Sequence, residues 1–169
     1  VDFSSENIYV NTLNMLGKNN TVNLGDSPNN KMNISIAGYT NGNGHFDTID
    51  LQDNNAETFN IKQGTIIKAD VFKLGSAANQ DHAINLEGAT ALELTNDLNF
   101  YTAATELNIN GANVSIKAGA GIDASGIVAG IINVNENAII QTSSIGANNN
   151  IAKIIIAAGK TLTLNDNGA

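Results

Sequence analysis

The sequence predicts an all-β fold: a right-handed parallel β-helix, or solenoid, of about seven turns with three short strands in each turn. Apolar residues alternate with polar ones in short runs, which places the apolar side chains on one face of a strand. These runs restart every 22 to 26 residues, and units of that length stack because one unit cannot bury its own apolar face. Asn and Gly, which tolerate tight turns, fill the gaps between the runs. The right hand is the usual one for crossovers between parallel strands.

Each repeat contains three rows of apolar residues, one row for each predicted strand. The first row opens the repeat and comprises Ile8–Val10, Ile34–Ile36, Phe59–Ile61, Ile84–Leu86, Leu107–Ile109, Ile132–Val134 and Ile154–Ile156. The second row comprises Leu16, Ile67, Leu92 with Leu94, Val114 with Ile116, Ile139 with Ile140, and Leu162 with Leu164. The third row comprises Val22 with Leu24, Ile49 with Leu51, Phe72 with Leu74, Leu98 with Phe100, Ile122, and Ile145. Turn signals such as Glu87-Gly88 and Asn110-Gly111 separate the rows.

One repeat departs from this pattern. After Ile36 the second row should fall near residue 42, but the segment from Gly38 to Phe46 has no alternating apolar pair. We expect a loop that protrudes from the stack here, because insertions in solenoids collect in loops that often line the binding face. The expected partner-binding residues are polar side chains bracketed by two aromatic ones. They are Tyr39, Asn41, Asn43, His45 and Phe46.

Asn recurs at the middle position of the first row, where a strand directs the side chain away from the core. Amides at equivalent positions of successive turns can hydrogen-bond along the stack. We therefore expect a structural ladder. Its members are Asn60, Asn85, Asn108 and Asn133.

Composition limits the partners. The 169 residues read as one β-helix domain, residues 1–169, that is a fragment of a longer protein. The net charge is −8 with no Arg and eight Lys, so we expect no nucleic-acid partner. No eighteen-residue apolar span is present, so we expect no direct membrane insertion of this segment. Cysteine is absent, which excludes disulfides and thiolate chemistry.

No residue set demands a reaction, so we expect the chain not to be an enzyme and to hold no cofactor or metal. Asp47, Asp50 and Asp53 are spaced by three, and residues three apart on a strand face opposite sides, so these carboxylates do not converge as glycosidic hydrolysis requires. The only histidines, His45 and His82, are 37 residues apart and fall at different corners of the predicted stack.

Three segments carry a family resemblance. They are Ile-Asn-Leu-Glu-Gly-Ala-Thr-Ala-Leu-Glu-Leu, Leu-Asn-Ile-Asn-Gly-Ala-Asn-Val-Ser-Ile and Ile-Asn-Val-Asn-Glu-Asn-Ala-Ile-Ile. They resemble passenger-domain turns of bacterial autotransporters, and the mixture of Ile, Asn and Lys without Arg is similar to that of the rickettsial surface cell antigens. The resemblance implies an exported protein at the cell surface or outer membrane, with the signal peptide and membrane barrel outside this segment. The Gly-Asp-Ser-Gly motif of protease members is absent, because Pro28 replaces its final glycine.

The resemblance implies an adhesin or surface antigen that attaches to a host-cell surface protein or glycan. Two alternatives stay open: a carbohydrate-active β-helix, such as a phage tail or a cell-wall polysaccharide hydrolase or lyase, and a purely structural stalk. Uncapped ends of a β-stack expose strand edges that pair with other chains, which predicts end-to-end self-association.

Overall fold

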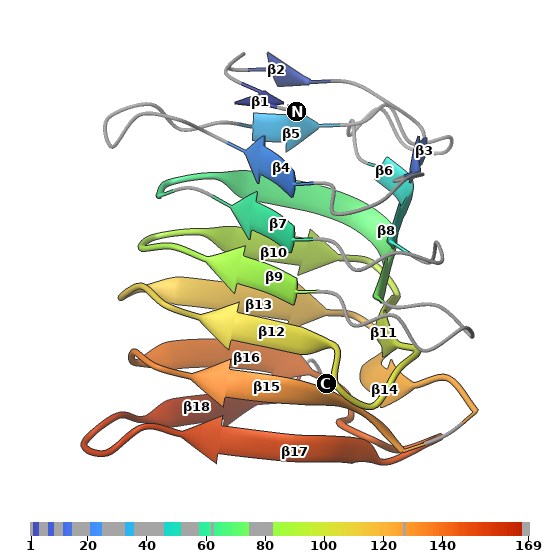
Figure 1. Cartoon of the computed structure of the whole chain (residues 1–169), viewed down its shortest axis with the longest axis vertical. Helices are drawn as coiled ribbons and strands as arrows, with labels where there is room; N and C mark the ends of the chain where they lie inside the picture. The colour runs from blue at the N-terminus through green and yellow to red at the C-terminus, as the bar shows by residue number, and fades with distance from the viewer. Residues whose placement is uncertain are drawn as a thin grey trace.

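A computed structural model describes residues 2–3, 7–8, 12–14, 21–24, 33–35, 46–51, 58–61, 63–74, 83–126 and 128–166, with side chains from Thr58 onward except that of Phe59. The described residues form an all-β parallel solenoid of about four turns and contain no helix. Figure 1 shows the strands stacked one above another along the long axis. None of these residues belongs to a helix with the length and apolarity to cross a membrane. The predicted parallel solenoid is therefore confirmed.

One side of the stack is a seven-stranded parallel sheet, here called the first face. In spatial order it comprises β1 (Asp2–Phe3), β4 (Thr21–Leu24), β7 (Thr58–Ile61), β9 (Ala83–Leu86), β12 (Glu106–Ile109), β15 (Ala129–Val134) and β17 (Ile151–Ile156). The pairing keeps one register throughout, so that Asn60 pairs with Asn85 and Asn85 with Asn108.

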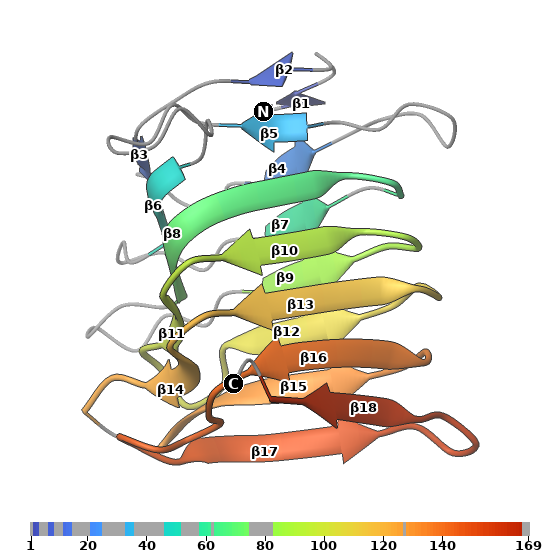
Figure 2. The same ribbon diagram turned by 180° about the vertical axis from the view of Figure 1, so that it is seen from behind.

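The other strands form an eleven-stranded sheet that bends around a corner, because the long strand β8 (Ile66–Leu74) belongs to both of its parts (Figure 2). The second face comprises β2 (Asn7–Ile8), β5 (Asn33–Ser35), the first half of β8, β10 (Ala91–Leu94), β13 (Val114–Ala118), β16 (Ala138–Thr142) and β18 (Leu162–Asn165). The third face comprises β3 (Thr12–Asn14), β6 (Phe46–Leu51), the second half of β8, β11 (Asp97–Phe100) and β14 (Gly121–Ala124).

The first two predicted restarts are assigned to the wrong face. Ile8 pairs with Ile34, and Ile34 pairs with Ile67, so both belong to the second face. Val22 and Leu24, predicted in the third row, lie in β4 on the first face. The error has a physical cause: apolar alternation is the same on every face, and the chain lengths that connect the faces are irregular before Thr58. From Thr58 onward the predicted rows match the observed faces.

The predicted seven turns with three strands each are not confirmed. After β16 the third face continues only as an isolated bridge between Ile122 and Ile145. The chain from Ser143 to Asn150 crosses this side without forming a strand.

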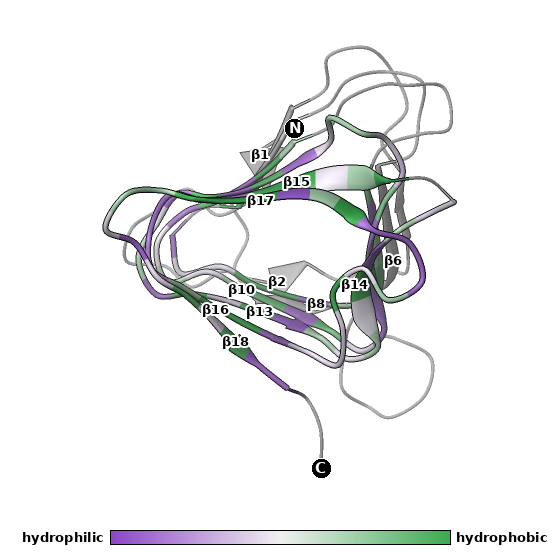
Figure 3. Ribbon diagram, turned by 90° about the horizontal axis from the view of Figure 1, so that it is seen from below, coloured by the Kyte–Doolittle hydropathy of each residue, from purple (hydrophilic) through white to green (hydrophobic). Residues whose placement is uncertain are grey.

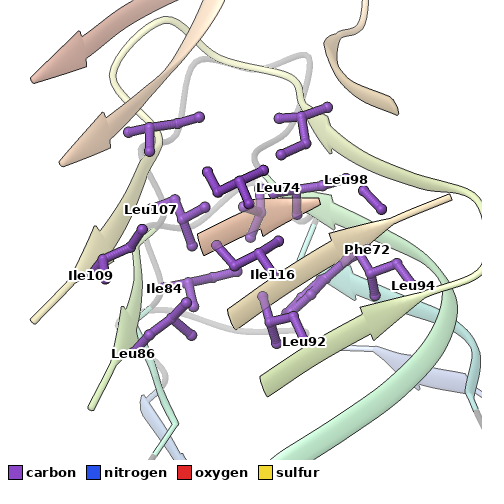
Figure 4. Packing of buried hydrophobic residues seen from close by; sticks show 14 of the residues in the cluster. Phe72, Leu74, Ile84, Leu86, Leu92, Leu94, Leu98, Leu107, Ile109 and Ile116 are labelled. Carbon is purple, nitrogen blue, oxygen red and sulfur yellow. The ribbon is translucent and has the colours of Figure 1, made fainter. Parts of the chain in front are cut away.

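The core consists of apolar columns that run along the stack (Figure 4). On the first face Ile61, Leu86, Ile109 and Val134 follow one another in register, and each is fully buried. The view along the axis shows the first and second faces opposing each other across the interior (Figure 3). Burial of an Ile or Leu side chain contributes roughly 1.5–3 kcal/mol, so these columns dominate the stability of the stack.

Candidate functional site

The predicted contact loop connects β5 to β6. Ten residues, 36–45, separate these two strands, whereas two residues separate β10 from β11 and two separate β13 from β14. The chain is thus longer at this corner than at the equivalent corners. The reason given by the sequence pattern is nevertheless wrong, because the second-face strand of this repeat is present as β5.

The predicted contact residues divide at the start of β6. Tyr39, Asn41, Asn43 and His45 lie outside the described residues. Phe46 is the first residue of β6 and pairs with Ala69, whose side chain is fully buried. The register places Phe46 beside Ala69 on the neighbouring strand, and its expected contact role stays a prediction.

The four predicted ladder residues are joined by hydrogen bonds along the first face. Asn85 donates from Nδ2 to Oδ1 of Asn60 over 2.7 Å, Asn108 donates to Asn85 over 3.0 Å, and Asn133 donates to Asn108 over 2.7 Å. All four side chains are partly buried. The next register position is Ile155, which carries no amide, so the ladder does not continue onto β17.

A single amide–amide contact lies beside the ladder, where Asn135 donates to Asn110 over 2.8 Å. The Asn108 amide also donates to Glu106 within its own strand. Because an amide offers two donors and two acceptor lone pairs, the inner ladder members keep acceptor capacity after these bonds. The ladder amides on the outer surface of the first face are therefore held at the spacing of the strands.

An acidic corner on the third face is absent from the sequence predictions. Asp97 pairs in register with Gly121, two residues before Asp123, so the two acids lie on neighbouring strands. A Cβ on Gly121 would lie 2.9 Å from Asp123 Oδ2 and 2.9 Å from Ser144 Oγ, so a side chain there would require these two side chains to shift. The available signal was the repeat itself, because Asp97, Asp123 and Asn148 are separated by 26 and 25 residues.

Asp123 holds the segment that covers it. The Asp123 carboxylate accepts hydrogen bonds from the Asn148 backbone N–H at 3.2 Å and from Asn148 Nδ2 at 3.0 Å, and the residue is 4% exposed. Burial, and secondarily the charge of Asp123, raise the pKa of Asp97 above its ordinary value. A pair of carboxylates on adjacent turns is what polysaccharide cleavage uses, but cleavage needs both of them at the substrate. The burial of Asp123 favours an anchoring role for this corner.

Of the other singled-out acids and histidines, the structure describes the backbone of two. Asp47 and Asp50 both lie in β6, and Asp50 is the register partner of Lys73 on the neighbouring strand β8. Asp53, His45 and His82 fall outside the described residues. Where the structure describes the chain, no group of three or more His, Cys, Asp or Glu side chains is placed to hold a metal ion.

Comparison with protein-family models, with characterised proteins and with solved structures gives no match for this chain.

Proposed function

We propose that this chain is part of an exported, cell-surface β-solenoid that acts as an adhesin or surface antigen in attachment to host cells. In this proposal the partner is a host-cell surface protein or glycan. The repeated strands serve as a rigid scaffold, and attachment uses a loop that the scaffold presents, since binding residues are commonly carried by loops on rigid frameworks. The passenger resemblance of the repeats supports the location at the surface.

The observation that carries the proposal is the length of the connection between β5 and β6. Ten residues stand where equivalent corners have two, and they include Tyr39, Asn41, Asn43 and His45. An aromatic residue beside adaptable polar ones is a composition typical of binding loops. The solenoid can turn this corner without a ten-residue connection, because β8 runs from the second face onto the third face without a break.

The proposal includes a finer architecture, a right-handed helix of seven turns with three strands in each. Seven strands in one continuous sheet support the number of turns. The residues of β3 and β6 pair with each other at Leu13 and Ile49, which supports a third strand in the N-terminal turns.

The alternative of polysaccharide cleavage needs two carboxylates that reach one glycan. The acidic corner does not favour it, because Asn148 occupies the Asp123 carboxylate and the chain covers it. A purely structural stalk is the outcome expected if the chain does not attach to cells.

The test measures attachment of the purified, fluorescently labelled chain to intact host cells. We expect saturable attachment that falls by about tenfold, the loss of one good anchor contact, when Tyr39 and His45 are both replaced by Ala. A second variant replaces residues 36–45 by two residues, as at the neighbouring corners, and should also lose attachment. Both variants should keep the thermal midpoint within a few degrees of the parent.

The matched control is Tyr101→Ala, which removes a half-buried aromatic side chain at another corner. It should leave attachment unchanged. Attachment that survives both loop variants would assign contact to another surface, and no attachment by the parent chain would support the stalk.

A further inference from the structure

Asn110 and Gly111 form a chemically labile pair directly after the first-face strand β12. Of the asparagines that the structure describes, Asn110 alone is followed by glycine. Asparagine is a thermolabile residue, because the backbone nitrogen that follows it can attack its side-chain amide carbon. Side chains on the following residue hinder this attack, and glycine, which has no Cβ, does not. The equivalent positions on the adjacent turns are Glu87-Gly88 and Asn135-Glu136, which lack the pair.

The stacking of the turns requires the glycine of this pair. A Cβ added to Gly111 would overlap the backbone N and Cα of Gly88 on the preceding turn. Backbone atoms do not move aside as the end of a flexible side chain does, so the close approach of the two turns needs glycine here. The labile pair is therefore a consequence of the packing between turns.

The contacts of the pair leave its reacting groups available. Asn110 is exposed, its backbone N–H donates to the Leu86 carbonyl over 2.9 Å, and its Oδ1 accepts from Asn135 Nδ2 over 2.8 Å. Neither Asn110 Nδ2 nor the Gly111 N–H donates to another described residue. A donor at Oδ1 stabilises the negative charge that develops on this oxygen when the amide carbon is attacked. The amide carbon is thus activated, while the nucleophile and the leaving group are unbonded.

We propose that Asn110 is a self-modification site, at which the chain converts this asparagine to aspartate or isoaspartate without an enzyme. A bond forms between Gly111 N and Asn110 Cγ, and the Cγ–Nδ2 bond breaks. The proton of the Gly111 N–H passes to Nδ2, which leaves as ammonia, and a succinimide ring remains. One water then adds across a ring C–N bond. Opening at Cγ gives aspartate at position 110, and opening at the backbone carbonyl gives isoaspartate.

The two products differ in how well they fit the stack. A carboxylate at position 110 still accepts the hydrogen bond from Asn135, although it brings a second negative charge close to Glu87 one turn earlier. Isoaspartate adds a methylene to the backbone beside the contact of Gly111 with Gly88, where a single Cβ would already overlap. Aspartate is therefore the product that preserves the stack, and it adds one negative charge to a net charge of −8.

The test incubates the folded chain and the guanidinium-unfolded chain at the same mildly alkaline pH and measures conversion by peptide mass spectrometry. In the folded chain we expect Asn110 to convert at least about tenfold faster than Asn135, which is exposed at the equivalent position but precedes glutamate. Ammonia release should match the conversion. Asn110→Gln should give no product at this position on the same time scale, because its longer side chain closes a ring much more slowly.

The hydrogen bond at Oδ1 is tested with Asn135→Ala. We expect Asn110 to convert several-fold more slowly in this variant, because the developing charge on Oδ1 loses its donor. The matched control is Ser115→Ala, which removes an exposed side chain of β13 outside this turn and should convert at the parent rate. Asn110→Asp carries the aspartate product and should keep the thermal midpoint within a few degrees of the parent. Circular dichroism checks that each variant keeps its strands.

Two results would overturn the proposal. One is an Asn110 that stays intact in the folded chain over the period in which it converts in the unfolded chain, which would show that the stack protects the pair. The other is conversion at Asn110 no faster than at Asn135 in the folded chain. A rate in Asn135→Ala equal to or above that of the parent would overturn the part assigned to Asn135.

Discussion

Single residues in this solenoid act through their copies one turn away. An Asn on the first face gains a hydrogen-bond partner because the next repeat places an equivalent Asn at the same register position. Such a bond contributes about 1 kcal/mol, and leaving a partly buried amide unpaired costs more than that. Asp97 shows the opposite effect. The neighbouring turn places Asp123, which carries the same charge, near it, and this like charge helps to raise the pKa of Asp97. Repetition therefore favours neutral side chains that both donate and accept.

Asp97 should make stability depend on pH. Its pKa is raised in the folded state, first by burial and then by Asp123, so the folded state binds the proton more tightly than the unfolded state. The stability from this proton is fully present below the ordinary value of 3.8 and is lost as the pH rises through the folded pKa. We expect Asp97→Asn to be more stable than the parent at pH 7, with the difference vanishing at low pH.

Urea unfolding at pH 3 and pH 7 measures this difference. In an NMR titration, Asp123→Asn should lower the pKa of Asp97 but leave it above its ordinary value, because burial is the larger cause. A pH-independent effect of Asp97→Asn would contradict the assignment.

At the scale of elements, one close contact between two faces requires a glycine. Gly130 in β15 has φ = +82°, and a Cβ there would overlap the ring of Phe100, which is fully buried in β11. The backbone is also held at this point, where the Gly130 N–H donates to the Thr102 carbonyl over 3.2 Å. The aromatic ring fills the space that a side chain on β15 would otherwise occupy.

Gly130→Ala should therefore cost stability for two reasons, the positive φ and the clash. We expect a loss of about 2–4 kcal/mol in the free energy of unfolding. Gly126→Ala is the matched control, because Gly126 has φ = +81° and nothing within 4 Å of a Cβ; it should cost about 1 kcal/mol. Denaturant titration of both variants isolates the clash as their difference, and equal losses would show that the ring moves aside freely.

The described residues form a stack in which each strand pairs by backbone hydrogen bonds only with strands of the turns directly above and below it. In such a stack, stability is a sum of repeat and interface terms, so strands with two neighbours are held more firmly than strands with one. β12 lies between β9 and β15, whereas β17 has β15 alone on its sheet. Among the residues whose side chains the structure describes, β17 and β18 also carry four of the six exposed large apolar side chains, which are Ile154, Ile155, Ile156 and Leu164.

Amide hydrogen exchange should follow this order. At low protein concentration we expect β17 amides to exchange at least about tenfold faster than β12 amides, because opening an end strand breaks one interface. The exchange is measured by NMR or by mass spectrometry. Uniform exchange along the stack would indicate all-or-none opening and contradict the additive description.

Local pattern was sufficient to predict the parallel solenoid and the rows after Thr58. Alternation of Ile, Leu and Asn has the period of a strand, and a repeat of nearly constant length leaves one way to stack such strands. The positions of the ladder Asn residues follow from the strand period and the repeat length. Neither depends on how distant segments meet.

Distant segments account for what the pattern could not indicate. Ile34 belongs to the second face because the connections before Thr58 differ in length, and alternation carries no label for the face. Asp123 is buried where the backbone N–H and side-chain amide of Asn148, 25 residues further along the chain, bond to its carboxylate. Loop closure and burial are set by contacts between residues far apart in the chain, so they become visible only when the turns are stacked.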